Sequence, residues 1–397
     1  MKQAIGLHSV AVNGGDELLY VVLKKGLTEL SNTKIIAKTT NSSHSFTYLR
    51  KNVFWNEELI GENFIKSGKL KIIFRRWQIH KLGLFRNTLE FFSPNVEELS
   101  RLINQSDYIA FMPGGYLHEY YGVQDKAMMA EVIKRMGKPI YIFGPSFGPF
   151  KSDRERKFAQ RLLNCADKII LRENISAEYV RDIDPEAISK TEVTTDVAFA
   201  YNYLFDRNVN IESIDENRVL LNFRNWTHGI NPNKVIELGV MVSTYLYEQG
   251  FDIEYISTCQ GVEGYADDST VAKEIVEAVR REEPEYQPKI HTRKYKPGEL
   301  LECMEGAAFY VGMRLHGAIS SMLSYVPAFN IGYEHKSEGV YKTIGLQDYT
   351  VGIKSPISEI MDHIKVFVKE PSYDRREKFR EAVKVGEKKA IESFKKL

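Results

Sequence analysis

Three side chains that could bind and protonate an anion follow two short apolar runs in the second half of the chain. The run 307–311 is followed by Arg314 and His316, and the run 328–331 is followed by a polar segment that contains Lys336. Arginine and lysine bind phosphate and carboxylate groups, arginine through two parallel hydrogen bonds, and histidine can transfer a proton near neutral pH. These residue types predict a cationic pocket for a small anion that carries several charges.

The elements around these side chains would bring them together. The two apolar runs predict neighbouring buried strands, and the small and apolar residues 317–323 predict a helix that begins at His316. In an open α/β sheet, ligands bind at the carboxyl ends of strands, where helix N-termini point. A single histidine after a strand is more often structural, so a structural role for His316 stays open. The neighbouring Arg314 and Lys336 favour a functional one.

Two more arginines follow predicted strands. Arg172 comes directly after the run 168–171, and Arg224 comes after the run 218–223. Each would therefore lie at a strand carboxyl end, where it could bind an anion. For Arg172 the alternative is a salt bridge at the start of the following helix.

The first predicted strand, 2–12, ends in a glycine turn. Asn13-Gly14-Gly15-Asp16 precedes a predicted helix over 17–30. Two glycines let the backbone bend tightly and approach a ligand closely. Asp16 could cap the helix, or it could be a catalytic or acceptor-binding group, and the two roles can coexist.

Strands and helices alternate along the whole chain, once before and once after the polar, aperiodic segment 203–217. This alternation predicts an α/β fold class with two Rossmann-like domains, whose mainly parallel sheets face a central cleft. That architecture is called glycosyltransferase B-like, and the cleft would be the default site. We place the N-terminal domain at 1–205, the C-terminal domain at 206–370 and an amphipathic C-terminal helix at 371–397.

Composition excludes several classes of protein. The net charge of +1 over 397 residues argues against general nucleic-acid binding. The three cysteines form no C-x-x-C pair, so neither a zinc site nor a disulfide framework is predicted, and a reducing cytoplasm fits. The N-terminal residues lack the apolar core of a signal peptide, and no window of about 18 apolar residues could span a bilayer.

The stretch 66–86 is basic and has no acidic residue, and aromatic and aliphatic side chains interleave with its lysines and arginines. Such a stretch can bind the anionic inner face of a membrane. It can equally be a solvated surface with one buried side. Both interpretations stay open.

A series of short motifs, taken in chain order, resembles the polysaccharide pyruvyl transferase family across nearly the whole chain. One departure is Glu173, where such proteins usually carry Asp, and the basic stretch 66–86 is not part of the shared pattern. The matching pieces are Asn13-x-Gly15-Asp16, the strand and glycine turn 107–115 with Gly114 and Gly115, the segment 137–149, Arg172-Glu-Asn-Ile-Ser176, Thr195-Asp196, Arg314-Leu-His316-Gly317 and Tyr333-x-x-Lys336.

The resemblance implies that a pyruvyl group moves from phosphoenolpyruvate to two hydroxyls of a hexose, with galactose the best single candidate, to give a cyclic ketal in capsule or exopolysaccharide biosynthesis. It implies His316 as general acid, since the enol carbon must be protonated, with Asp16 as second catalytic residue. Phosphoenolpyruvate would be a co-substrate, and no metal or other cofactor is expected because fixed cations can do the electrostatic work. The implied substrate-binding residues are Asn13, Gly15, Gly114, Gly115, Arg172, Arg224, Arg314 and Lys336.

We expect the acceptor to be a lipid-linked oligosaccharide, with the enzyme in the cytoplasm. Two alternatives share the architecture. One is a sugar-nucleotide-dependent glycosyltransferase, for which the sequence shows no base- or ribose-binding signature. The other is a non-catalytic glycan-binding protein, against which the presence of Arg314, His316 and Lys336 argues.

Overall fold

The computed structural model describes residues 1–7, 13–38, 102–209, 213–225, 229–262 and 266–397. Within them the chain forms two compact units. Unit 1 comprises Met1–Ala11, Leu19–Val197 and Ile391–Leu397, and unit 2 comprises Val12–Leu18 and Ala198–Ala390. The basic stretch 66–86 lies outside the described residues. The predicted domain boundaries at 205 and 370 stay predictions.

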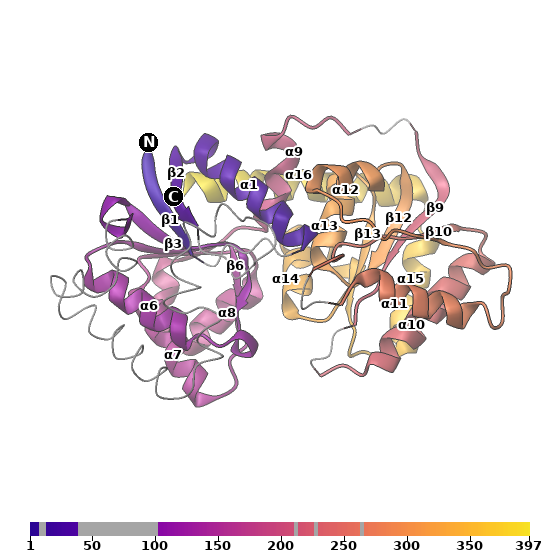
Figure 1. Ribbon diagram of the computed structural model, residues 1–397, viewed down its shortest axis with the longest axis horizontal. Coiled ribbons are helices and arrows are strands. Elements are labelled where there is room, and N and C mark those ends of the chain that lie inside the picture. The colour runs from indigo at the N-terminus through magenta and orange to yellow at the C-terminus, as the bar shows by residue number, and fades with distance from the viewer. Residues whose placement is uncertain (8–12, 39–101, 210–212, 226–228, 263–265) are drawn as a thin grey trace. The chain divides into compact units, whose positions relative to one another are not determined.

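Unit 1 is built on a six-stranded sheet in the order β2-β1-β3-β5-β7-β8, and all neighbouring strands are parallel (Figure 1). The central strand β3 has four buried residues, Tyr-Ile-Ala-Phe, as expected where helices cover both faces of a parallel sheet. The strands are β1 (Lys2–Leu7), β2 (Thr33–Lys38), β3 (Tyr108–Phe111), β5 (Ile140–Phe143), β7 (Lys168–Leu171) and β8 (Thr191–Val193).

The glycine turn that we predict at Gly114 and Gly115 and part of the motif segment 137–149 form a pair of short parallel strands in unit 1. These are β4 (Gly114–Leu117) and β6 (Pro145–Phe147). They follow β3 and β5, which are themselves parallel neighbours. The two continuations therefore leave the sheet side by side in the same direction, which allows them to pair despite the glycines and proline.

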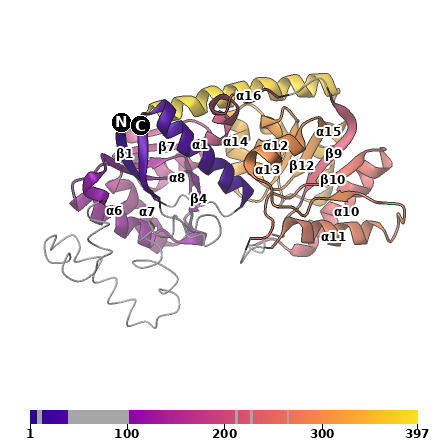
Figure 2. The same ribbon diagram turned by 45° about the horizontal axis from the view of Figure 1, so that its top comes forward.

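The helices of unit 1 alternate with its strands. Among them α6 and α7 pack side by side (Figures 1 and 2). In α7 the Ser152 hydroxyl accepts from the Glu155 amide at the N-terminus, and four residues on the inner side are buried. The described helices of unit 1 are α6 (Gln124–Arg135), α7 (Asp153–Cys165) and α8 (Asn174–Ile183), with 3₁₀ turns at Glu119–Tyr121 and Pro185–Lys190.

Unit 2 has a second six-stranded parallel sheet, in the order β11-β10-β9-β12-β13-β14. Its central strand β12 (Ala-Ala-Phe-Tyr-Val-Gly) is buried along its whole length, as its continuous apolar run predicts. The strands are β9 (Asp215–Asn222), β10 (Asp252–Tyr255), β11 (Lys289–Ile290), β12 (Ala307–Gly312), β13 (Ala328–Gly332) and β14 (Thr350–Gly352).

The helices of unit 2 lie on both faces of this sheet, with α10 and α11 on one side and α12 and α13 on the other (Figures 1 and 2). They are α9 (Tyr201–Leu204), α10 (Pro232–Glu248), α11 (Asp268–Val279), α12 (Pro297–Met304), α13 (Leu315–Leu323), α14 (His335–Thr343) and α15 (Ile357–Lys369), with 3₁₀ turns at Val197–Ala200, which spans the boundary, and Gln347–Tyr349. We predict only a polar loop where α14 forms. It is a helix because Ser337, Val340 and Tyr341, at helical spacing, bury one face.

Two helices contribute residues to both units. In α1 (Gly14–Leu30) the first turn belongs to unit 2 and the rest to unit 1. In α16 (Ser372–Lys395) the last turns belong to unit 1, where Phe394 packs on Phe143 with ring centroids 5.3 Å apart. None of the described helices is long and apolar enough to cross a membrane.

Candidate active site

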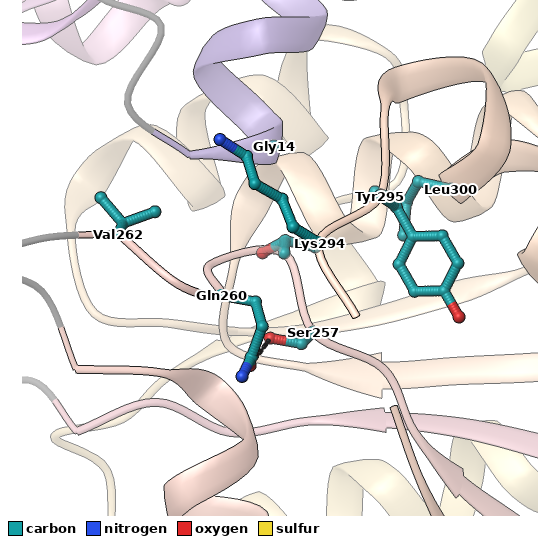
Figure 3. A pocket seen from close by; sticks show the side chains of 8 residues that line it. Gly14, Ser257, Gln260, Val262, Lys294, Tyr295 and Leu300 are labelled. Carbon is teal, nitrogen blue, oxygen red and sulfur yellow. Dashed lines mark hydrogen bonds between the residues drawn. The ribbon is translucent and has the colours of Figure 1, made fainter. Parts of the chain in front are cut away.

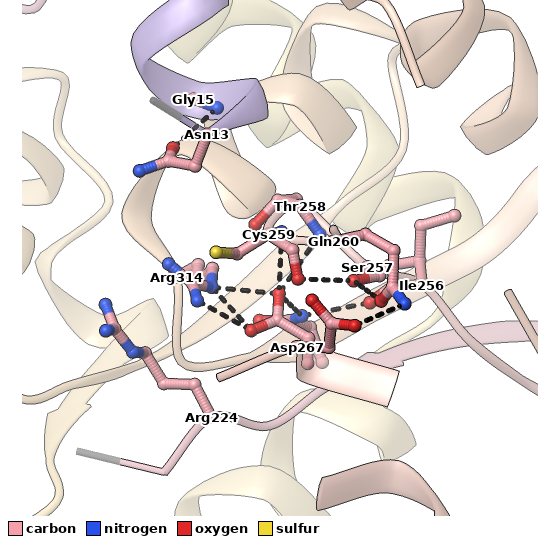
Figure 4. Close-up of polar contacts among 12 residues, drawn as sticks. Asn13, Gly15, Arg224, Ile256, Ser257, Thr258, Cys259, Gln260, Asp267 and Arg314 are labelled. Atoms are coloured by element: carbon pink, nitrogen blue, oxygen red, sulfur yellow. Dashed lines mark hydrogen bonds and ion pairs between the residues drawn. The ribbon is translucent and has the colours of Figure 1, made fainter. Parts of the chain in front are cut away.

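Arg314 lies just before α13, with its guanidinium fixed by a carboxylate. Its Nε is 2.9 Å from both oxygens of Asp268, and its Nη2 is 2.7 Å from Oδ1 (Figure 4). The side chains are 8% and 3% exposed. Burial disfavours the charged guanidinium, but the charge of Asp268 outweighs that effect and raises the pKa of Arg314. The arginine is therefore always cationic and held in one orientation.

Asp268 is itself held by three further donors. The backbone amides of Thr258 and Cys259 and the side-chain amide of Asn222 each donate to its Oδ2 at 3.1 Å. Asp268 is also the first residue of α11, where the helix dipole favours a negative charge. Strand ends β9 and β10 thus position the carboxylate that positions Arg314.

His316 lies in the first turn of α13, in contact with the glycine turn at the start of α1. A Cβ atom added to Gly15 would lie 2.6 Å from His316 Cβ and 2.7 Å from its Nδ1. No side chain fits between them. The turn is anchored to unit 2 by a 2.8 Å hydrogen bond from the Gly14 amide to the Thr258 carbonyl. The glycines therefore allow close approach, here to the imidazole.

Asn13 caps α1. Its Oδ1 accepts from the amides of Gly15 and Asp16 at 3.0 and 3.1 Å, and its Nδ2 donates to Asp16 Oδ2 at 2.8 Å. The capping contacts that we consider for Asp16 thus come from Asn13. Asp16 is left as an oriented carboxylate in the first turn.

Asp16 connects the predicted residues electrostatically. Burial raises the pKa of Asp16 above its usual range, and the positive charges of His316, Lys336 and Arg314 oppose this rise without cancelling it. All four residues belong to unit 2. The structure therefore brings Asp16, His316, Arg314 and Lys336 into one site, although Asp16 is distant from the others in sequence.

Lys336 and Arg224 meet at the ring of Tyr333. The Lys336 ammonium is 5.6 Å from the ring centroid, and the Arg224 guanidinium carbon is 5.0 Å from it. Arg224 also donates to the Tyr333 hydroxyl at 2.9 Å, and Lys336 is paired with Glu334. Tyr333 thus holds two cations from different strand ends near each other.

A small pocket beside Gly14 is lined by the end of β10 and the segment before α12 (Figure 3). Its polar lining includes Ser257, Gln260 and Lys294, and the Lys294 ammonium is 3.1 Å from a carboxylate oxygen of Glu17 in the first turn of α1. This ion pair adds a second attachment of α1 to unit 2.

The remaining predicted residues lie in unit 1. Arg172 is 1% exposed; its Nη1 donates to Asp196 and its Nε to the Ser146 hydroxyl, both at 2.8 Å. These are the contacts of the salt-bridge alternative, and its role in substrate binding stays a prediction. Gly114 and Gly115 lie in β4, and their role also stays a prediction.

Sequence reasoning missed Asp268 and the part played by Tyr333. The signal for Asp268 was an acidic residue at the start of the segment that forms α11, which follows a strand of the same sheet as Arg314. Among the described residues, no group of three or more His, Cys, Asp or Glu side chains could hold a metal ion. A site that works without metal or cofactor stays a prediction.

Comparison with known proteins establishes the fold class. One solved structure that resembles the chain is S. aureus MnaA with UDP, at 11% identity, with 99% of this chain and 94% of that chain covered and a TM-score of 0.58. A second is OtsA, at 10% identity, with 100% of this chain and 98% of that chain covered and a TM-score of 0.57. A third is UDP-GlcNAc 2-epimerase from Neisseria meningitidis bound to UDP-GlcNAc, at 10% identity, with 100% of this chain and 98% of that chain covered and a TM-score of 0.54. At such identities the likeness concerns the fold alone, and it confirms the predicted α/β, glycosyltransferase B-like class.

Two sequence comparisons point to the family. The chain is 23% identical over 385 residues to the amylovoran biosynthesis protein AmsJ of Erwinia amylovora, and the match covers 88% of each protein. The model of the polysaccharide pyruvyl transferase family matches residues 13–335, from the cap of α1 to the start of α14. The chain therefore belongs to the polysaccharide pyruvyl transferase family, and so to the transferases.

Proposed function

We propose that the site in unit 2 binds phosphoenolpyruvate and that the enzyme transfers its pyruvyl group to two hydroxyls of a hexose, giving a cyclic ketal and phosphate. The observation that carries this proposal is the position of His316, which contacts the turn that holds Asp16 and lies two residues after the buried, carboxylate-paired Arg314. Two fixed cations, a proton donor and a carboxylate in one site suit a substrate with a phosphate, a carboxylate and a carbon that must be protonated.

The charges of the site suggest how it accepts a polyanion. Its two fixed cations are matched by carboxylates, because Asp268 pairs with Arg314 and Glu334 pairs with Lys336, and Asp16 adds a third carboxyl group. The charges of the site therefore largely cancel before a substrate binds. A bound anion adds negative charge, which raises the proton affinity of the titratable side chains next to it. Two groups could carry this proton: the carboxyl group of Asp16, whose pKa is raised, and the imidazole of His316. Substrate binding would therefore bring in the proton that the reaction needs.

The reaction then balances without a redox step. His316 gives a proton to the methylene carbon of phosphoenolpyruvate, and the first sugar hydroxyl forms a C–O bond to the central carbon while Asp16 takes its proton. The bond from that carbon to the phosphate oxygen breaks, and phosphate leaves with Arg314 and Lys336 neutralising its charge. The second hydroxyl forms the second C–O bond and gives its proton to the departing phosphate, which closes the ketal.

The choice of acceptor in this proposal is based on the family and not on the geometry of the site. The name of the Erwinia relative, an amylovoran biosynthesis protein, supports a role in polysaccharide assembly. We propose galactose in a lipid-linked oligosaccharide as the acceptor, used on the cytoplasmic side of the membrane, with contact through the basic stretch 66–86. Co-sedimentation of the purified protein with anionic liposomes tests the membrane contact. Absence of co-sedimentation, with equal pyruvylation of a free sugar, would reject it.

The direct test is incubation of the purified enzyme with phosphoenolpyruvate and galactose-containing acceptors, with phosphate release and the mass of the acceptor as readouts. Phosphate release with the mass gain of a pyruvate ketal is the expected result. Release of a nucleoside diphosphate from a sugar nucleotide, with no use of phosphoenolpyruvate, would show a glycosyltransferase instead. His363→Gln, at an exposed site on α15, is a matched control for histidine variants.

A further inference from the structure

A second group of reactive side chains lies in unit 2 at the edge formed by β10, β11 and α12, among residues to which the proposed reaction assigns no role. The imidazole of His291 contacts a carboxylate on one side and a thiol on the other. Its Nε2 is 2.8 Å from Glu254 Oε2, and its Nδ1 is 3.8 Å from the sulfur of Cys303. The Tyr295 hydroxyl lies 2.6 Å from Nδ1 and 3.7 Å from the same sulfur.

This arrangement fixes the roles of the two imidazole nitrogens. A carboxylate can only accept, so Nε2 carries a hydrogen and donates it to Glu254. Nδ1 then presents a lone pair toward the Tyr295 hydroxyl and the Cys303 thiol. His291 is 7% exposed, and its backbone amide donates to the Tyr255 carbonyl at 2.9 Å, so the ring is held in place. A base oriented by a carboxylate and directed at a thiol is the arrangement that activates nucleophilic cysteines.

The charged groups around the pair stabilise its ionised form. Arg218 on β9 and Lys289 on β11 both pair with Glu254, at 3.1 and 3.3 Å, and Arg218 also donates to the Cys303 carbonyl at 2.7 Å. Arg293 lies 4.7 Å from the centroid of the Tyr295 ring. Arg293 is itself paired with Glu299 at 2.8 Å, so Arg218 and Lys289 are the two cations that face the single carboxylate of Glu254, which leaves room for one more negative charge.

Proton affinities agree with this geometry. Burial opposes the imidazolium, but hydrogen bonds with Cys303 and Glu254 outweigh it and raise the pKa of His291 to about 9. Burial likewise opposes the thiolate, yet hydrogen bonds with His291 and Tyr295 lower the pKa of Cys303 below that of an ordinary thiol. The other two cysteines, Cys165 and Cys259, are buried, and burial raises the pKa of each.

We infer that Cys303 is a nucleophilic thiol, activated by His291 and Glu254, and a site of modification by peroxides and by soft carbon electrophiles. With hydrogen peroxide, the thiolate sulfur attacks one oxygen, an S–O bond forms and the O–O bond breaks. Sulfur is oxidised to sulfenic acid, and the other oxygen takes the imidazolium proton and leaves as water. Cys303 is half-buried, whereas Cys165 and Cys259 are buried.

The test uses the reduced full-length protein, limiting iodoacetamide at pH 6.5, and mass spectrometry of the three cysteine peptides. An ordinary thiol is about 1% thiolate at this pH, whereas a thiol with a lowered pKa is ionised to a larger fraction. The lower nucleophilicity of a low-pKa thiolate reduces this advantage to about 10-fold in rate. We expect Cys303 to react about 10-fold faster than glutathione, and faster than Cys165 and Cys259.

Variants separate activation from mere exposure. His291→Gln removes the base and should slow the alkylation of Cys303 at least to the rate of glutathione, whereas the matched control His363→Gln should leave it unchanged. A rate for the wild type no higher than that of glutathione, or one unaffected by His291→Gln, would overturn the inference. If His291→Gln does not fold, the wild-type profile decides. A rate that rises by clearly less than tenfold per pH unit between pH 6 and 8 supports activation, and a tenfold rise per pH unit rejects it. Trapping of the sulfenic acid with dimedone after peroxide treatment completes the test.

Discussion

The substitution Asp268→Asn tests whether Arg314 depends on its carboxylate. Asp268 accepts six hydrogen-bond contacts: three from Arg314 at 2.7 to 2.9 Å and three from Thr258, Cys259 and Asn222 at 3.1 Å. Asparagine keeps one oxygen. If that oxygen faces the amides, the NH₂ group of the asparagine faces the guanidinium of Arg314, so that two hydrogen-bond donors face each other. Breaking a buried ion pair in this way costs about 3–5 kcal/mol, a large part of the about 5–15 kcal/mol that stabilises a domain.

We expect urea unfolding, followed by far-ultraviolet circular dichroism, to show that loss for Asp268→Asn, and phosphoenolpyruvate affinity measured by calorimetry to fall by about 2 kcal/mol or more. Asp267→Asn is the matched control, because the neighbouring Asp267 is half-buried and accepts from Gln260 and Gly261, which are neutral. It should change stability by less than about 1 kcal/mol. Equal, small effects of both substitutions would refute the view that Asp268 holds Arg314 in place.

Three further predictions concern the contact between α1 and α13. Gly15→Ala puts a methyl group within 2.7 Å of the His316 ring, so we expect phosphate release to fall about 100-fold as the imidazole is displaced, with circular dichroism unchanged. His316→Gln should lower turnover by about 100-fold or more with phosphoenolpyruvate affinity nearly kept; an unchanged turnover with only a higher substrate requirement would assign His316 to binding. Asp16→Asn should raise stability at pH 7, because a carboxylate whose folded pKa is raised is stabilising only when protonated. The gain in the free energy of unfolding, measured by urea titration, should shrink as the pH falls through the raised pKa of Asp16 toward the ordinary value of about 4. A gain that grows toward acid pH would contradict the prediction.

Periodicity and apolar runs were sufficient to predict most of the fold. β12 is a continuous apolar run and is buried throughout, and alternation of strand and helix predicts both parallel sheets. The exceptions were short or polar elements. The β4–β6 pair depends on two strand ends that lie side by side only after the sheet has formed. The helix α14 contains too few apolar residues to outweigh its polar composition in a sequence-based assignment.

For the site, residues that follow strands in sequence were predictable, and their partners were not. Arg314 and His316 follow β12 and Lys336 follows β13, and these two strands are neighbours in the sheet, as the two apolar runs predict. Asp268 and Arg314 are 46 positions apart in the sequence and come together only in the folded chain. They meet where β10 and β12 end, on either side of β9. Arg172 shows the converse case, since the same strand-end rule applies to it and its described contacts are a buried ion pair with Asp196.

The glycine turn at residues 13–16 brings these observations together. Its contacts explain why two glycines and an asparagine precede α1. Gly14 is tied to the end of β10, Gly15 leaves room for the imidazole of His316, and Asn13 satisfies the helix start so that Asp16 need not. A carboxylate freed from capping and placed among three cations would normally ionise readily, yet burial keeps its pKa raised. Asp16 is thus a buried carboxylate with a raised pKa beside His316, which is the kind of environment in which acid–base groups are found.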